Sequence, residues 1–376
     1  MKRIEWIDLT RGIAMIMIII GHSMYVYSAS GLVRLFFAVH VPIFFVLSGY
    51  LFKRRSWSRL LKGLMGNILL PYFGTVLIIM FLSWLAPGLP GWVGIKGLGS
   101  LSKAALAGIA GVGTSLPVSK AALVGISGVA TPVPFIFNHN LSVPAIGVIW
   151  FLLAMFLGNL IFNGLLNIRR YFKCSDMVLF LLSIVLTGMG FGLTKFGVLP
   201  WSLNAALVSQ SFYWFGFWLR QTNLMDTWCK HSWILVVAVI LWGLSAWIGP
   251  FYLNIGFAAN PFFAVIGAMG GSFTIIIFAK WLSNFDRKRL SWLTLFGKES
   301  LIVMCIHMID LDNLKLGDFI FAHSNALFGP LLAVILVILY RILLTTVAVY
   351  LIPHLPWIRS VYMHRQFPFK RKKVFS

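Results

Sequence analysis

Charged residues are scarce in this chain, and acidic ones are the scarcest. Only 9 of the 376 residues are Asp or Glu, against 31 Lys or Arg, and charged residues make up 11% of the total. Soluble domains carry about 25% charged residues, so this composition excludes an ordinary soluble domain. With 60% hydrophobic residues and a mean hydropathy of +0.91, the chain is predicted to be a polytopic membrane protein.

Cysteine is also scarce, and several familiar catalytic motifs are missing. Cys174, Cys229 and Cys305 lie far apart and lack the spacing of metal ligands, so we expect free thiols and no metal. The sequence contains no Ser-His-Asp order, no phosphate-binding loop and no HExxH motif. These absences argue against a triad hydrolase, a P-loop nucleotide hydrolase and a zinc protease.

The net charge of +22 does not indicate a nucleic acid partner. Lys and Arg fall mainly in short loops between apolar segments, which is the positive-inside pattern of membrane proteins. The loops on one side carry clusters such as 53–55 and 287–289, whereas the opposite loops carry scattered cations such as Arg34 and Lys315. This asymmetry predicts a multi-pass protein of the cell membrane with both termini in the cytoplasm.

Hydropathy predicts an all-α protein, a single membrane domain over residues 1–376 with about ten transmembrane helices. The expected spans are 12–29, 35–52, 64–85, 146–163, 177–194, 204–219, 232–249, 260–280, 291–308 and 329–352.

An outer segment, 86–145, contains a tandem 17-residue repeat, 102–118 and 119–135, and each copy is too short to span the membrane. We interpret it as a duplication in a tolerant loop, with a re-entrant or interfacial hairpin as the alternative. The basic tail, 353–376, is expected to bind anionic lipid or to fix the topology.

Arg11 and His22 place two ionisable side chains in the first apolar segment. Ten residues separate them, so at about 100° per residue they share one face of a helix, about 16 Å apart along its axis. Ionisable groups are costly in a bilayer unless they face a cavity or a partner, so both are functional candidates. Imidazole also exchanges its proton readily near neutral pH. We therefore predict that His22 and Arg11 are both catalytic, although Arg11 paired with Asp8 is also explained as a topological anchor.

A dense basic cluster follows the second expected span. Lys53, Arg54, Arg55, Arg59 and Lys62 all lie there. Positive-inside anchoring explains such a cluster. The functional alternative is a site for the phosphates of a nucleotide-like donor that arrives from the cytoplasm.

Several ionisable residues recur in the last two expected spans. Lys298 and Glu299 are predicted to form an ion pair. Arg341 lies deep in the last span and requires a buried partner, for which Asp310 and Glu299 are the candidates. His307 is expected near the outer end of its span, where it lines the acceptor side or only hydrogen-bonds to the backbone.

Two motifs in the first two spans point to a known family. They are Arg-x10-His over residues 11–22 and His-Val-Pro-Ile-Phe-Phe-Val-Leu-Ser-Gly-Tyr over residues 40–50. Less specific matches follow in order: Ile149-Trp150-Phe151-Leu152, Phe215-Gly216-Phe217 and Gly297-x-x-Ser300-Leu301-Ile302-x-x-x-x-His307. In this combination the chain resembles the membrane-bound acyltransferase-3 family, which includes bacterial O-acetyltransferases of surface glycans.

The resemblance implies a ten-helix core that takes acetyl from cytoplasmic acetyl-CoA. The acetyl group would pass to a hydroxyl acceptor, most simply a cell-surface glycan, on or near the outer face. The resemblance makes His22 the essential histidine and Arg11 its partner arginine. His40 and His307 then become candidates for the acceptor side.

The same resemblance assigns the basic cluster to the acyl donor. Arg55, Arg59 and Lys62 would bind the phosphates of acetyl-CoA. Lys62 stands where the family commonly has a second arginine. Because Lys is a point charge and not a planar fork, this departure weakens a bidentate phosphate clamp.

Two other classes of function compete with the enzyme. One is a transporter or flippase for a lipid-linked sugar or a small polar solute, with His22 and Arg341 lining its pathway. The sequence lacks the paired inverted repeats that are typical of transporters. A non-catalytic scaffold would tolerate the loss of His22. The sequence names neither the acceptor, the acyl chain length nor the oligomeric state. It also leaves His22 open as general base or as acyl carrier.

Overall fold

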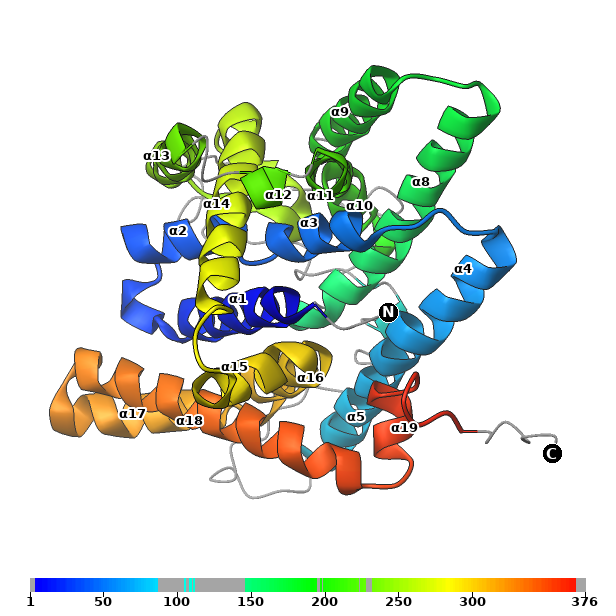
Figure 1. The fold of residues 1–376 in the computed structure, drawn as a ribbon. Coiled ribbons are helices and arrows are strands. Elements are labelled where there is room, and N and C mark those ends of the chain that lie inside the picture. Colours follow the sequence, from blue (N-terminus) through cyan, green and yellow to red (C-terminus); the bar gives the residue numbers. More distant parts are fainter. Residues whose placement is uncertain are drawn as a thin grey trace.

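The chain is helical almost throughout the part that the structure describes (Figure 1). The computed structural model describes residues 4–86, 146–194, 199–222, 224–227 and 232–369, with the single positions 105, 108, 109, 111 and 197. The expected all-α membrane class is therefore confirmed. The tandem repeat at 102–135, apart from four of those single positions, and the tail beyond 369 lie outside the described residues.

Helix α1 occupies the middle of the bundle, with α2 and α3 on one side and α15, α16 and α18 on the other (Figure 1). The helices are α1 (Glu5–Ser23), α2 (Gly31–Val39), α3 (Pro42–Leu51), α4 (Trp57–Leu64), α5 (Leu70–Leu85), α8 (Trp150–Tyr171), α9 (Asp176–Leu193), α10 (Leu203–Val208), α11 (Gln210–Gln221), α12 (Leu224–Thr227), α13 (Ser232–Ile248), α14 (Pro261–Leu282), α15 (Arg287–Lys298), α16 (Ser300–Ile309), α17 (Leu316–Phe328), α18 (Pro330–Leu351) and α19 (Ile358–Tyr362). Short π-helical segments, Met65–Leu69 and Asp310–Leu314, follow α4 and α16.

The predicted count of ten spans is wrong for the described part of the chain. Seven helical segments there are long and apolar enough to cross a membrane, or eight if the bent pair α15–α16 is one span. The expected span 204–219 is divided at Ser209 into α10 and α11, and 232–249 is the 17-residue α13, which is short for a span. The expected span 291–308 bends by 65° where α15 meets α16. Hydropathy averages over a window and does not register such breaks.

The crossing of α3 and α11 is close enough to require glycine. Gly49 of α3 lies against the backbone of Tyr213 in α11, and Gly216 of α11 lies against the backbone of Val46, so a Cβ at either glycine would collide with main-chain atoms. Small residues permit this approach in membrane bundles, where packing replaces the hydrophobic effect as the force between helices. The crossing sets the position of α3, which begins at Pro42, two residues after His40.

A second close crossing fixes α1 itself. Gly297, at the end of α15, lies against the backbone of α1 at Asp8, and Gly12 of α1 lies against the backbone of Leu293 in α15. Two glycines therefore face each other across this crossing, as two do between α3 and α11. The helix that carries Arg11 and His22 is held rigidly from this side.

We expect Gly216→Ala to destabilise the protein by about 1–3 kcal/mol, because the added methyl group overpacks a crossing with no space for it. The measurement is thermal unfolding of the purified protein in detergent. Gly188→Ala in α9 is the matched control, since a Cβ there meets no atom of the described residues within 4 Å. The control should be neutral or slightly stabilising, because Ala is the better helix former. Equal losses in both variants would contradict the packing argument.

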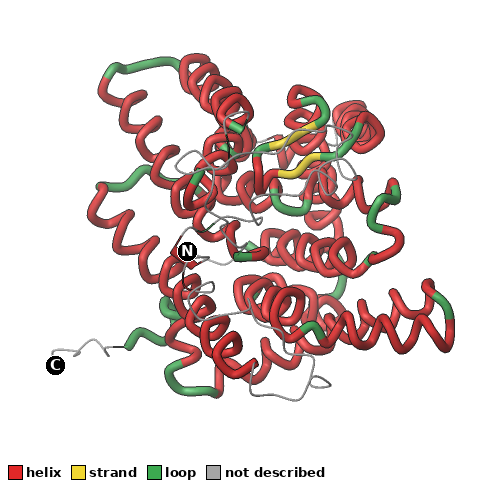
Figure 2. Tube along the Cα trace, turned by 180° about the vertical axis from the view of Figure 1, so that it is seen from behind, coloured by secondary structure: helices red, strands yellow, loops and turns green. Residues whose placement is uncertain are grey.

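A small hairpin joins α13 to α14 and was not expected from the sequence. Strands β1 (Phe251–Tyr252) and β2 (Phe257–Ala258) pair antiparallel, with Tyr252 opposite Phe257 (Figure 2). Strands of two residues show no alternation of polar and apolar side chains, so no sequence pattern predicts them. The hairpin contacts α2 and brings Phe251 and Tyr252 to the His22 end of α1.

Candidate active site

His22 lies in the last turn of α1, about 16 Å along the helix from Arg11. At this distance the two side chains do not touch. His22 lines a cavity at one end of the helix, and Arg11 lines a different cavity toward the other end. The two residues share one face of α1, as the sequence predicts, but they line two separate cavities.

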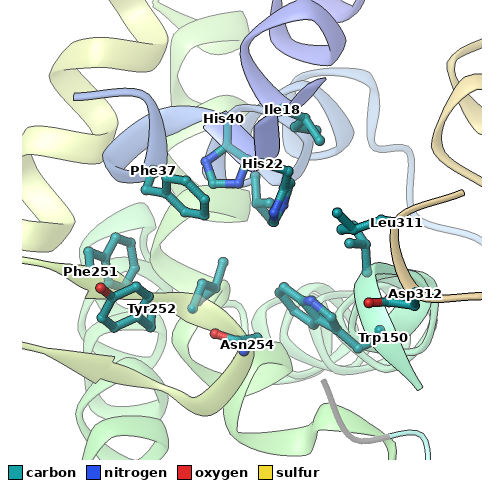
Figure 3. Close-up of a pocket in the computed structure, with 14 residues that line it drawn as sticks. Ile18, His22, Phe37, His40, Trp150, Phe251, Tyr252, Asn254, Leu311 and Asp312 are labelled. Atoms are coloured by element: carbon teal, nitrogen blue, oxygen red, sulfur yellow. The ribbon is translucent and has the colours of Figure 1, made fainter. Parts of the chain in front are cut away.

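The cavity at the His22 end has a volume of about 300 Å³, and we call it the histidine chamber (Figure 3). Its lining comes from α1, α2, the segment before α8, the β1 hairpin and the π-helical segment after α16. The lining residues are Ile18, His22, Phe37, His40, Val41, Gly147, Val148, Trp150, Phe251, Tyr252, Leu253, Asn254, Leu311 and Asp312. Apolar walls with a few polar groups are typical of small-molecule sites.

A second cavity of about 390 Å³, which we call the side cavity, also contacts His22. His22, Phe37, Phe251 and Tyr252 line both cavities. The lining of the side cavity then continues past Tyr25 and Ser28 to Arg34. His22 therefore faces two spaces from which a ligand can approach it.

Three histidines lie close together, and two of them, His22 and His40, line the histidine chamber. The ring centroid of His22 lies 5.8 Å from that of His307 and 6.3 Å from that of His40. Phe37 packs edge-on against both His22 and His40, at centroid distances of 5.3 and 4.6 Å. The structure thus brings together the three histidines that the sequence nominated separately.

The tautomer of His40 follows from its hydrogen bond. Its Nδ1 lies 2.9 Å from the carbonyl oxygen of Phe36, and because a carbonyl only accepts, Nδ1 carries the proton. In the neutral ring Nε2 is then an acceptor. His40 occupies the break between α2 and α3, because Pro42 lacks an N–H and begins a new helix. The break turns an imidazole acceptor toward His22 (Figure 3).

His307 is fully buried, and no described group hydrogen-bonds to either of its ring nitrogens. Asp312 Oδ2 is also buried without a hydrogen-bond partner among the described residues, and Asp312 lines the histidine chamber. Buried polar atoms without hydrogen-bond partners in the protein are explained by a bound ligand or a water molecule. The carboxylate fits beside Gly147, where a Cβ would collide with Asp312.

Arg341 holds the end of α1 through a buried network. Its Nε donates to Asp310 Oδ2 at 3.0 Å, and both side chains have no exposed surface, so Asp310 is the partner and not Glu299. Its Nη1 donates to the carbonyl oxygen of His22 at 3.0 Å and to Ser23 Oγ at 2.9 Å. The last carbonyl groups of a helix lack hydrogen-bond partners within the helix. A cation there also interacts favourably with the partial negative charge at the helix C-terminus. The backbone of His22 is thereby tied to α18 and, through Asp310, to the π-helical segment after α16.

The cavity around Arg11 has a volume of about 480 Å³, and we call it the arginine vestibule. Arg55, Lys298 and Arg365 also line it, whereas Arg59 and Lys62 are exposed on α4 and are not among its lining residues. Its remaining lining residues are Ser48, Leu51, Phe52, Lys53, Leu60, Gly63, Leu64, Asn67, Ile68, Met155, Asn159, Glu299, Ser300, Leu301, Tyr362, Met363, His364 and Gln366. The vestibule is strongly basic, and its other lining residues are both polar and apolar.

Two short-range ion pairs predicted from the sequence are present at the vestibule. Arg11 lies 4.0 Å from Asp8, and Lys298 lies 3.5 Å from Glu299. Asn163 of α8 holds Arg55 by its backbone, since its side chain accepts from Arg55 N at 3.1 Å and donates to Arg55 O at 3.2 Å. A fully buried amide therefore sets the position of the basic segment between α3 and α4.

Sequence reasoning missed several residues of the histidine chamber. Asp312, Tyr252 and Asn254 were not nominated, and Trp150 appeared only as part of a motif. Asp312 carried a detectable signal, because it is one of only 9 acidic residues in the chain. Within the described ranges, no group of three or more His, Cys, Asp or Glu side chains is arranged to hold a metal ion.

The fold and the site define a multi-pass membrane protein whose helix α1 connects a basic cavity with a chamber of histidines. The family model of the acyltransferase-3 domain matches residues 4–351, nearly the whole chain, and the protein belongs to this family of membrane acyltransferases. Neither the curated proteins nor the solved structures include a significant match to the chain.

Proposed function

We propose that the protein transfers an acetyl group from acetyl-CoA to a hydroxyl of a cell-surface glycan or its precursor. The observation that carries this proposal is the position of His22, which faces both the histidine chamber and the side cavity. Family membership supports an acyl donor and a hydroxyl acceptor at the membrane. We place the Arg11 end of α1 on the cytoplasmic side and the protein in the plasma membrane, as the positive-inside pattern predicts.

The acceptor hydroxyl is a poor nucleophile, and His22 provides the base that it needs. A neutral imidazole nitrogen takes the hydroxyl proton while the oxygen attacks the thioester carbonyl. The carbon–sulfur bond then breaks, and the leaving thiolate takes up a proton. In the covalent variant, the His22 nitrogen attacks the thioester first and the acceptor then removes the acetyl group. Both routes require His22 at the meeting point of donor and acceptor.

The arginine vestibule suits the charged part of the donor. Arg11, Arg55 and Lys298 supply cations for phosphate oxygens, and the vestibule borders α1 at Arg11. A donor bound there would extend its thioester arm along α1 toward His22. Arg11 therefore binds and orients the donor in this proposal, whereas His22 acts on the reacting atoms.

We expect Arg55→Gln to raise the KM for acetyl-CoA roughly fivefold while kcat changes little, because a charge-assisted contact to the bound donor is lost. Initial rates measured at several acetyl-CoA concentrations provide the test. Arg59→Gln is the matched control, since Arg59 also belongs to the basic cluster but does not line the vestibule. If Arg59→Gln raised KM as much as Arg55→Gln, the donor would lie outside the vestibule.

The proposed function is tested by the O-acetyl content of surface glycans. Glycans are isolated from cells that lack the protein and from the same cells complemented with it at matched membrane levels. We expect acetyl esters to be lost and then restored, and the esterified position identifies the acceptor. If deletion changed no acetyl ester and purified protein failed to consume acetyl-CoA, an acetyltransferase would be ruled out and a transporter would become the better explanation.

A further inference from the structure

A basic cavity beside the arginine vestibule, with which it shares Phe52 and Lys53, is not used by the proposed reaction. It has a volume of about 720 Å³ and lies where α3, α8 and α11 end. We call it the basic pocket. Six cations line it: Lys53, Arg54, Arg169, Arg170, Lys173 and Arg220.

The positive charge of the basic pocket is largely uncompensated. Among the described residues, the carboxylate that pairs with this set is Asp176, 2.6 Å from Arg169. Arg54 donates instead to the neutral amide of Asn167 at 2.8 Å, and Arg220 to the carbonyl oxygen of Phe52 at 3.4 Å. These bonds orient the guanidinium groups without neutralising them. A cavity with this charge is suited to a phosphate-bearing ligand.

The position of the basic pocket does not suit the reacting end of an acyl donor. Its lining residues come from α8, α11 and the segments that follow α3 and α8, and none belongs to α1 or α16. The arginine vestibule contacts both of these helices through Arg11 and Ser300. A donor in the basic pocket would therefore contact neither α1, which carries Arg11 and His22, nor α16.

The surface next to the basic pocket is apolar and exposed. Ile168 and Phe172, beside the basic residues at the end of α8, are 43% and 67% exposed. Met177 and Leu181 continue this surface along α9, at 60% and 49% exposed. Aromatic and aliphatic side chains at this level of a membrane protein face the boundary between headgroups and acyl chains. A ligand with a phosphate head and hydrocarbon chains matches both the pocket and this surface.

We propose that the basic pocket binds the headgroup of an anionic phospholipid, with its acyl chains along the exposed surface of α8 and α9. Basic pockets between membrane helices bind such headgroups, and each Lys or Arg near the surface contributes about fivefold in affinity. This binding does not depend on catalysis. The lipid would fix the relative positions of α3, α8 and α11, and so support the crossing that places α3 beside α1.

The test is thermal unfolding of the purified full-length protein titrated with short-chain phosphatidylglycerol or short-chain phosphatidylcholine. We expect only phosphatidylglycerol to raise the unfolding midpoint in a saturable way. Arg170→Gln/Lys173→Gln should weaken its apparent affinity about 30-fold, from two cations at about fivefold each. The matched control is Lys288→Gln/Arg289→Gln, which removes two exposed cations at the start of α15 and should leave the affinity unchanged.

Three results would overturn the proposal. The first is an equal response to both lipids. The second is an equal loss of affinity in the pocket variant and in the control variant, which would indicate general attraction of anions. The third is a pocket variant that binds coenzyme A more weakly but phosphatidylglycerol as before, which would assign the basic pocket to the donor.

Discussion

His22→Ala is expected to reduce acyl transfer by about 10²–10⁴-fold, the range that general acid–base catalysis contributes. His22 borders both the histidine chamber and the side cavity, and a methyl group there can neither take a proton nor carry an acetyl group. The protein should still fold and insert, because the His22 side chain is not fully buried and the bond from Arg341 goes to its backbone. The measurement is transfer from labelled acetyl-CoA, per mole of protein in the membrane.

His323→Ala is the matched control for this prediction. His323 is an exposed histidine on α17; its Nδ1 lies 2.8 Å from the carbonyl oxygen of Phe319, and its ring lies against the Phe319 ring of the same helix. Its removal should leave acyl transfer unchanged.

His40→Ala gives a further comparison, since the His40 ring, with Nε2 as its acceptor, lies beside His22. If His22→Ala kept full activity while His40→Ala lost it, the proton acceptor would be His40 and the proposed role of His22 would be wrong.

Local spacing predicted the parts of the candidate site that lie on one helix. The periodicity of an α-helix gives the shared face of Arg11 and His22 and the pair of Arg11 with Asp8, because these depend only on positions along α1. Pro42 explains the break before α3, within the segment 35–52 that hydropathy predicted as one span. The sequence did not predict that Arg11 and His22 line different cavities, since the cavity walls come from other helices.

The residues that the sequence missed are those that only tertiary structure brings together. Tyr252 and Asn254 come from a short hairpin, and Asp312 from a π-helical segment, yet all three line one chamber with His22. No spacing rule connects segments more than 200 residues apart in the chain. The choice of Asp310 over Glu299 as the partner of Arg341 required the same information, because both acids are too far from Arg341 in the chain for helical spacing to decide between them.

The buried pair of Arg341 and Asp310 has the largest expected effect on stability. Arg341→Met leaves Asp310 as an unpaired charge in a site without exposed surface, so we expect a loss of about 3–5 kcal/mol. Tyr340 alone, which donates to Asp310 Oδ1 at 2.9 Å, cannot compensate for this charge. Thermal unfolding in detergent measures the loss. Arg289→Met, at an exposed position, is the control and should stay within about 0.5 kcal/mol of wild type.

A double variant separates this stabilising role from the positioning of His22. Arg341→Met/Asp310→Leu removes both charges, and replacing a buried pair by apolar residues is often neutral for stability, so the unfolding temperature should largely recover. Activity should not recover, because the carbonyl oxygen of His22 and Ser23 Oγ still lack the donor at 3.0 and 2.9 Å. The loss should appear in kcat and not in the KM for acetyl-CoA, since the vestibule is untouched. If kcat recovered together with stability, Arg341 would hold the bundle together without positioning the catalytic histidine.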